Sequence, residues 1–239
     1  MKIATWNVNS IRVRMPHLID WLKAEQPDVV ALQETKILDD DFPRLELKAA
    51  GYESVCSGQK AYNGVAILSR VPATEVACDI PGFDDPQKRV IAATIGGVRV
   101  ISVYVPNGER VSSPKYQYKL AWMERLEAYF RDEIARHGRV VALGDFNVAP
   151  EERDVHDPVW WKGKVMFSEP ERAMFQRFLA TGFADAFRLF EQKPGEFTWW
   201  DYGWGAFPKN RGLRIDHVLV SEALHAECRE CRIDRAPRA

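Results

Sequence analysis

The stretch from Arg139 to Asn147 reads RVVALGDFN. Residues 139–143 are a short, mostly apolar run, which is typical of a strand covered on both faces. The run ends at Gly144, after which an acid and an amide follow, Asp145 and Asn147. Polar groups at the end of a core strand are costly to bury, so such an end is expected to open to solvent. The stretch therefore predicts a buried strand that ends at a functional site.

Strand and helix patterns alternate on both sides of this stretch. Apolar runs predict further strands over residues 2–8, 28–34, 64–70, 89–95, 98–105 and 213–220. Helical spacing of apolar residues predicts helices over 15–27 and 116–134, and a Ser168–Glu171 capping box predicts a third over 169–180. The Gly96-Gly97 pair predicts a hairpin, which a purely parallel sheet would not contain. We therefore predict an α/β (α+β) fold of two packed mixed β-sheets flanked by helices.

The composition indicates one globular domain. Hydrophobic residues make up 46% and charged residues 28% of 239 residues, and no linker-like stretch interrupts them, so we expect a single domain over residues 1–239. No apolar run approaches the ~18 residues of a membrane span, and the N-terminal MKIATWNVNS does not resemble a secretory leader. The net charge of −1 excludes a globally basic protein that coats nucleic acid. A polyanion would therefore bind to a local basic patch or through metal ions.

The cysteines indicate a reducing compartment. The four thiols are Cys56, Cys78, Cys228 and Cys231, too few for a disulfide framework in a chain of this size. Cys228 and Cys231 form a C-x-x-C, but the second pair that a structural zinc site needs is missing. We expect free thiols and a cytoplasmic location.

Acids and amides end or interrupt several of the apolar strands. They are Asn7, Asn9, Glu34, Asp145, Asn147 and Asp216, of which the last lies inside the strand predicted over 213–220. Each alone could cap a turn, but together they predict one shared opening. Oxygen donors of this kind favour Mg²⁺, and no pair among the five histidines has the spacing of zinc ligands. Hydrolysis of a phosphate ester fits such a site, because the metal neutralises phosphate oxygens while an acid activates water.

Seven motifs resemble the exonuclease III family of apurinic/apyrimidinic endonucleases. They are WNVNSIR (6–12), LQETK (32–36), NGVAILSR (63–70), YVPNG (104–108), GDFNVAP (144–150), FTWWDY (197–202) and NRGLRIDHVLVS (210–221). They occur in order, and the likeness runs from residue 1 to about 235. The resemblance implies an endonuclease/exonuclease/phosphatase domain with a deoxyribonuclease I-like fold, a four-layer sandwich in agreement with the pattern above.

The resemblance also implies roles for single residues. Glu34 would hold Mg²⁺, for which Mn²⁺ can substitute, and Asn7 would help to bind the metal. Asp145 would take the proton from the attacking water, Asn147 would hold that acid and the phosphate, and Tyr104 would face the scissile phosphate. Asp216 would be a further catalytic acid. Substrate would be bound by Asn9, Arg12, Lys36, Asn107, Asn210 and Arg211, with Trp199 and Trp200 lining the pocket for a base-less sugar. Lys60, Lys209 and Arg214 would extend the basic rim along the phosphates.

The likeness departs from the family pattern after Pro237. Family members carry a Ser/Thr-Asp-His motif and a final strand there, and the acid matching Asp216 orients that histidine. This sequence ends at Ala239 without either, and His217 should point away from Asp216 because neighbours on a strand face opposite sides. For this chain alone we expect impaired hydrolysis. We also expect an exposed sheet edge, which would lower the stability or recruit a second chain. Without such recruitment we expect a monomer. The milder explanation is that the natural protein continues.

Three functions remain open at this point. The first is a Mg²⁺-dependent DNA repair nuclease that cuts double-stranded DNA 5′ to abasic sites, leaves a 3′-hydroxyl and also trims 3′ ends. The second is a catalytically impaired, nuclease-like protein that only binds nucleic acid, which the missing histidine supports. The third is a phosphodiesterase for a non-DNA ester such as a phosphoinositide, against which FTWWDY and NRGLRIDHVL argue.

Overall fold

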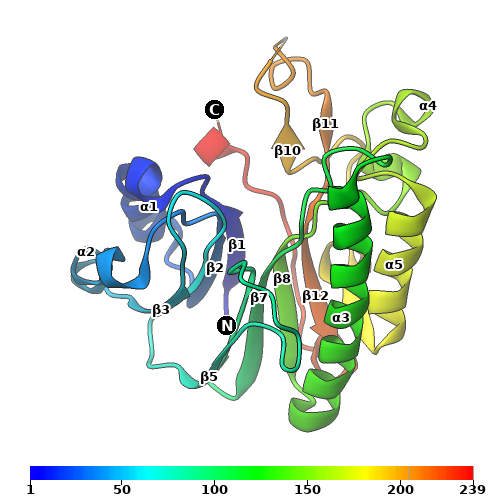
Figure 1. Cartoon of the computed structure of the whole chain (residues 1–239). Coiled ribbons are helices and arrows are strands. Elements are labelled where there is room, and N and C mark those ends of the chain that lie inside the picture. Colours follow the sequence, from blue (N-terminus) through cyan, green and yellow to red (C-terminus); the bar gives the residue numbers. More distant parts are fainter. Residues whose placement is uncertain (204, 239) are drawn as a thin grey trace. The chain divides into compact units, whose positions relative to one another are not determined.

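The computed structural model describes residues 1–203 and 205–238, which form two compact units. The first unit comprises Met1–Tyr104 and Arg139–Asp145, and the second Val105–Gly138 and Phe146–Ala239. The strands are β1 (Ile3–Asn7), β2 (Val29–Gln33), β3 (Glu53–Ser57), β4 (Val65–Ser69), β5 (Thr74–Cys78), β6 (Val90–Ile95), β7 (Val98–Tyr104), β8 (Val140–Asp145), β9 (Phe183–Asp185), β10 (Trp199–Trp200), β11 (Gly212–Leu213) and β12 (Asp216–Ser221). The α-helices are α1 (Ile11–Glu25), α2 (Arg44–Ala49), α3 (Pro114–His137), α4 (Pro158–Trp161), α5 (Glu169–Ala180) and α6 (Glu222–His225) (Figure 1).

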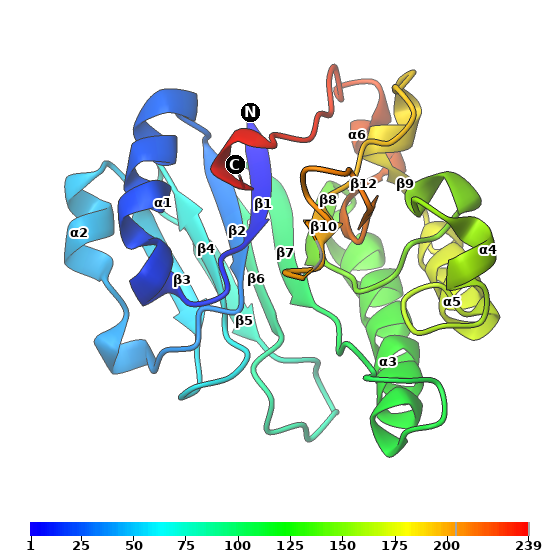
Figure 2. The same cartoon turned by 90° about the horizontal axis from the view of Figure 1, so that it is seen from above.

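The first sheet of the first unit has the strand order β1-β2-β4-β3. β1 and β2 are parallel, with Asn7 opposite Gln33, whereas β4 runs antiparallel to both β2 and β3. Helices α1 and α2 cover this sheet (Figure 2), where Leu22 and Leu47 pack with Leu32 in one apolar cluster. All residues of β2 are buried, as its continuous apolar run predicted.

The second sheet contributes β5, β6, β7 and β8 to this unit, in that order. β7 and β8 are parallel, and their register places Tyr104 opposite Asp145. The two sheets are joined by a buried chain of hydrogen bonds, in which Gln33 Nε2 donates to Ser102 Oγ at 3.1 Å and that hydroxyl donates to the Leu32 carbonyl at 3.3 Å. The prediction of two packed mixed sheets with flanking helices is therefore confirmed.

Gly144 in β8 is required by the close approach of β7. Its φ is 148°, and a Cβ at this position would lie 1.9 Å from the carbonyl oxygen of Val103. Any larger residue would push the two strands apart. The glycine of the GDFN stretch thus allows the pairing that places Asp145 beside Tyr104.

The second unit is built on α3 and α5, which lie side by side (Figure 1). The Phe130 ring of α3 meets Phe178 of α5 edge-on at 5.4 Å and Phe183 of β9 at 5.2 Å. β9 pairs antiparallel with β12, and β10 pairs antiparallel with β11. The predicted capping box begins α5, where the Glu171 carboxylate accepts from the Ser168 N–H at 3.1 Å.

The structure corrects one predicted strand. The run over 213–220 is divided into β11 and β12, so that Asp216 begins a strand instead of lying inside one. The N–H groups of Ile215 and Asp216 both donate to Thr198 Oγ1, at 3.0 and 3.1 Å, and Arg214 turns its side chain inward. The sequence pattern also missed β3, β5, β9, β10, α2, α4 and α6, which are short and only partly buried.

Within residues 1–203 and 205–238, no helix is long and apolar enough to cross a membrane. The thiols of Cys56, Cys78, Cys228 and Cys231 are free, as expected.

Candidate active site

In the first unit, polar side chains meet at the carboxyl ends of the two parallel strand pairs. β1 ends at Asn7, Glu34 follows β2, and β8 ends at Asp145. The Asn7 side-chain nitrogen donates to Glu34 Oε1 at 2.8 Å and to Asp145 Oδ2 at 2.9 Å. One amide thus joins two carboxylates from different sheets, and these three predicted residues lie together.

Two more predicted residues complete this group. Lys36 Nζ lies 2.9 Å from Glu34 Oε2 and donates to Asn9 Oδ1 at 2.5 Å, while the Asn9 N–H donates to Asn7 Oδ1 at 3.0 Å. Asn9, Glu34 and Lys36 have φ values of 44°, 54° and 55°. Residues other than glycine rarely adopt this left-handed conformation, and such strain gathers at functional sites. The backbone around this acid cluster is therefore held in a costly but defined geometry.

Tyr104 faces the same cluster. Its burial, followed by the negative charges of Glu34 and Asp145, raises the pKa of its phenol far above the ordinary value. The Arg89 guanidinium, 4.7 Å from the centre of the ring, offsets part of this effect. The hydroxyl consequently stays protonated at neutral pH and can donate a hydrogen bond to an oxygen that gains negative charge.

The donor chemistry of this cluster fits a hard divalent cation. Across the part of the chain that the structure describes, no three His, Cys, Asp or Glu side chains are arranged to hold a metal. Mg²⁺ does not need such a cage, because it is usually bound through one or two carboxylates and retained waters. The Glu34 carboxylate already binds a cation, the Lys36 ammonium, and its neighbours in the group supply further oxygen atoms.

In the second unit, the predicted residues Asn107 and Asn147 are hydrogen-bonded to each other. Asn107 Nδ2 donates to Asn147 Oδ1 at 3.2 Å, and Asn147 Nδ2 donates to the Val105 carbonyl at 2.9 Å. Asn147 is buried and has a φ of 49°. Its side chain is thus fixed in one orientation by two partners.

The predicted sugar-pocket residues have different environments. Trp199 is half-buried against an apolar cluster that includes Leu213, whereas Trp200 is buried. The Trp200 ring packs edge-on against Phe207 at 4.9 Å, and its Nε1 donates to Asn210 Oδ1 at 3.2 Å. Trp199 is therefore the better candidate for contact with a substrate, while Trp200 and Asn210 support the fold around it.

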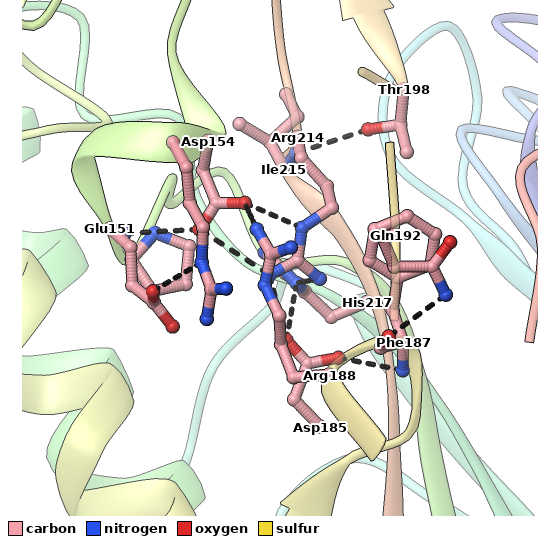
Figure 3. A network of polar contacts seen from close by, with 12 residues as sticks. Glu151, Asp154, Asp185, Phe187, Arg188, Gln192, Thr198, Arg214, Ile215 and His217 are labelled. Atoms are coloured by element: carbon pink, nitrogen blue, oxygen red, sulfur yellow. Dashed lines mark hydrogen bonds and ion pairs between the residues drawn. The ribbon is translucent and has the colours of Figure 1, made fainter. Parts of the chain in front are cut away.

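The predicted basic residues also differ in exposure. Arg12 and Arg211 are exposed, and Arg12 makes a surface ion pair with Asp41 at 3.2 Å. The prediction for Arg214 was wrong, because its side chain is buried between Asp154 and Asp185 (Figure 3). A guanidinium enclosed in this way cannot contact a DNA phosphate.

His217 belongs to the same buried network (Figure 3). Burial, reinforced by the charge of Arg214, lowers the pKa of His217 to about 3, so the ring is neutral. Its Nε2 lies 2.8 Å from the Val148 carbonyl and its Nδ1 lies 2.9 Å from an Arg214 nitrogen. Because Nε2 faces a carbonyl oxygen while the nearest partner of Nδ1 is a guanidinium N–H, the proton resides on Nε2, and Nδ1 accepts from Arg214. Asp216 itself is half-buried.

This arrangement predicts that mild acid destabilises the protein through His217. The ordinary pKa is 6.5 and the folded pKa is about 3, so between these values the unfolded state binds a proton that the folded state does not. The free energy of unfolding should therefore fall as the pH falls below 6.5, by up to about 1.4 kcal/mol per pH unit from this group. In His217→Gln, whose amide can make both hydrogen bonds, the free energy of unfolding measured in urea should depend less steeply on pH. Equal slopes in the two proteins would contradict this prediction.

Sequence reasoning did not identify the buried charged residues of the second unit. Lys119 and Glu171 form an ion pair in which both side chains are completely buried. Lys119 lies on the apolar face of α3, three residues after Tyr116 and four residues before Met123. A lysine at a core position of an amphipathic helix is the signal that could have found it.

Comparison with known proteins identifies the family. A model described as the Endonuclease/Exonuclease/phosphatase family matches residues 4–238. The chain belongs to this family. Among curated members, exodeoxyribonuclease III of Haemophilus influenzae is 34% identical over 241 residues, which cover 95% of this chain and 90% of the relative.

Solved structures of this endonuclease/exonuclease/phosphatase family share the fold. A 3′ phosphatase from Neisseria, bound to a product DNA hairpin, is 47% identical and has a TM-score of 0.98, covering 100% of this chain and 93% of that one. An AP endonuclease from Archaeoglobus fulgidus is 40% identical with a TM-score of 0.96, at the same two coverages. The predicted resemblance to exonuclease III is confirmed, and the family depends on divalent metal ions.

Proposed function

We propose that this chain hydrolyses the backbone of double-stranded DNA 5′ to abasic sites, as a monomer in the cytoplasm, with Mg²⁺ as its metal and Mn²⁺ as a substitute. Its family and relatives make it a phosphodiester hydrolase of the DNA repair nuclease type. The observation that carries the proposal is the Asn7 amide that joins the carboxylates of Glu34 and Asp145. Two acids held by one neutral amide are suited to bind a cation and to accept a proton.

The first unit supplies the metal site and the base. Glu34 would hold the metal with the help of Asn7, and a bound metal would neutralise negative charge on the phosphate. Asn7 keeps Asp145 oriented through the bond to Oδ2, so that the carboxylate can take a proton from water. Tyr104, whose raised pKa keeps it protonated, would donate to a phosphate oxygen as charge develops there.

The second unit supplies groups for the substrate. Asn147, fixed by Asn107 and the Val105 carbonyl, would donate to the phosphate. Trp199 would offer a flat apolar wall to a base-less sugar. Asp216 keeps the role of a further catalytic acid that the resemblance implies. Contacts along the DNA backbone are assigned to the remaining predicted residues, Asn9, Arg12, Lys36 and Arg211, with Asn210 and Trp200 as supports.

Removal of groups from 3′ ends is a second candidate activity. The 3′ phosphatase from Neisseria is 47% identical to this chain, compared with 40% for the AP endonuclease from Archaeoglobus fulgidus. A terminal phosphate needs the same cation, base and phenol as an internal one. The two activities thus differ in how DNA is placed and not in the chemistry of Glu34, Asp145 and Tyr104.

Two DNA substrates separate these activities. One is a duplex with a single abasic site, and the other is a duplex with a 3′-phosphate; an undamaged duplex and a phosphoinositide are the controls. With Mg²⁺ we expect cleavage on the 5′ side of the abasic site, and chelation of the metal should abolish it. Phosphate release alone would favour 3′-end trimming. Binding of DNA without any product in Mg²⁺ or Mn²⁺ would refute the proposal.

A further inference from the structure

Lys119 is a buried ammonium group that the mechanism above does not use. Its three N–H donors each have an acceptor: the carbonyl oxygen of Asn147 at 2.7 Å, that of Asn107 at 3.2 Å, and Glu171 Oε1 at 2.5 Å. The turn at Gly108 lies directly against its stem, since a Cβ there would be 3.0 Å from Lys119 Cδ. One side chain of α3 thus holds the backbone of both predicted asparagines.

Glu171 fixes the ammonium in turn. Its Oε1 also accepts from the Met166 N–H at 2.9 Å, and its Oε2 accepts from the N–H and hydroxyl of Ser168 at 3.1 and 2.5 Å. Every charge of the pair is therefore compensated inside the second unit. Buried ion pairs contribute little stability compared with apolar residues of the same volume, so stability alone does not account for an ammonium group here.

The Asn147 loop needs such a tether. Asn147 is in the left-handed region, with a φ of 49°, which a residue with a side chain adopts at a cost. Donors also hold two of the next three carbonyls in this loop, because His217 Nε2 lies 2.8 Å from the Val148 oxygen and Arg172 donates to the Pro150 oxygen at 2.9 Å. Lys119 donates to the carbonyl of Asn147 itself.

We propose that Lys119 is a positioning residue for the reaction: paired with Glu171, it holds the carbonyls of Asn107 and Asn147 so that the two side chains stay hydrogen-bonded and the Asn147 amide is aimed at the phosphate. This inference rests on the proposed role of Asn147. The Lys119 side chain is completely buried, so its effect would pass through the orientation of Asn147.

The kinetic test compares Lys119→Met, Asn147→Ala and the double variant on both DNA substrates. Because misplacing a reacting group by about 1 Å can cost about a hundredfold, we expect Lys119→Met to lower kcat by about that factor with KM nearly unchanged. The same change in the Asn147→Ala background should have little further effect. Equal losses in both backgrounds would overturn the proposal, as would an unchanged kcat.

Two variants separate positioning from general destabilisation. Arg99→Met removes another buried cation, one that donates to the Glu75 carbonyl at 2.6 Å in the first unit, and it should leave kcat unchanged. If Lys119→Met does not fold, Lys119→Met with Glu171→Gln removes both buried charges and should show the same loss of kcat. A loss of kcat in Arg99→Met equal to that in Lys119→Met would contradict a specific role.

A spectroscopic readout keeps the inference separate from the proposed function. The side-chain NH₂ signal of Asn147, labelled with ¹⁵N and assigned by its absence in Asn147→Ala, should be protected from exchange by the Val105 carbonyl. We expect Lys119→Met to abolish that protection and Arg99→Met to retain it. An inactive wild type with this result would refute the proposed function alone, whereas full protection in Lys119→Met would refute the role of Lys119.

Discussion

Replacing Asp145 by asparagine is expected to lower the rate of DNA hydrolysis by about a hundred- to ten-thousandfold, the range found when a general base is removed. The substitution keeps the shape of the side chain, and the new amide oxygen can still accept from Asn7 Nδ2, which now donates to Asp145 at 2.9 Å. What is lost is the capacity to accept a proton and a negative charge beside the metal site. Single-turnover cleavage of the abasic duplex measures the effect.

The same variant should not be destabilised. Asp145 is buried and shares the Asn7 amide with the Glu34 carboxylate, so two like charges lie close together in a poorly solvated place. Removing one of these charges should leave the midpoint of thermal unfolding unchanged or raise it. Lost activity together with retained stability is typical of a functional residue. Asp79→Asn is the matched control, since Asp79 is a half-buried acid of the same unit paired with Lys88 at 2.8 Å. Wild-type cleavage by Asp145→Asn would remove Asp145 from the mechanism.

The part of the site in the first unit could be predicted because its residues follow their strands directly. Asn7 and Glu34 come at the ends of β1 and β2, which are parallel neighbours, so the pairing of the two strands places them at the same edge of the sheet. Asp145 and Tyr104 are opposite each other for the same reason. The hydrophobic pattern that fixes the strands therefore also fixes these side chains, and the fold and this cluster could be predicted together.

The buried charges of the second unit could not be predicted in the same way. Arg214 lies in a loop-like, basic stretch and seemed exposed, but its partners Asp154 and Asp185 are 60 and 29 residues away in sequence. Lys119 similarly meets Glu171 across 52 residues. Local sequence patterns carry no information about such pairings, because a charged side chain can be buried only when it is paired, and here the partner is distant in sequence. The division of the strand at Arg214 follows from the same pairing.

Replacing Arg214 by methionine is expected to cause the largest loss of stability, about 3–5 kcal/mol, because breaking a buried ion pair leaves its partners uncompensated. Arg214 Nε donates to Asp154 Oδ1 at 2.7 Å, and another of its nitrogens lies 2.7 Å from Asp185 Oδ2 (Figure 3). After the substitution Asp154 keeps Arg188, while Asp185 loses a partner in the interior. Urea unfolding at neutral pH measures the change.

A second substitution shows whether uncompensated charge causes the loss. In the Arg214→Met background, Asp185→Asn removes the uncompensated negative charge, and the new side chain can still accept from the Phe187 N–H. It should therefore restore part of the stability there. In the wild-type background the same substitution should destabilise the protein. Lys115→Met, which breaks the exposed pair with Glu109, should leave stability nearly unchanged. If Arg214→Met were no less stable than Lys115→Met, the network would be dispensable for folding. If Asp185→Asn made Arg214→Met still less stable, packing and not charge would explain the loss, and the inward turn of Arg214 that divides β11 from β12 would need a different cause.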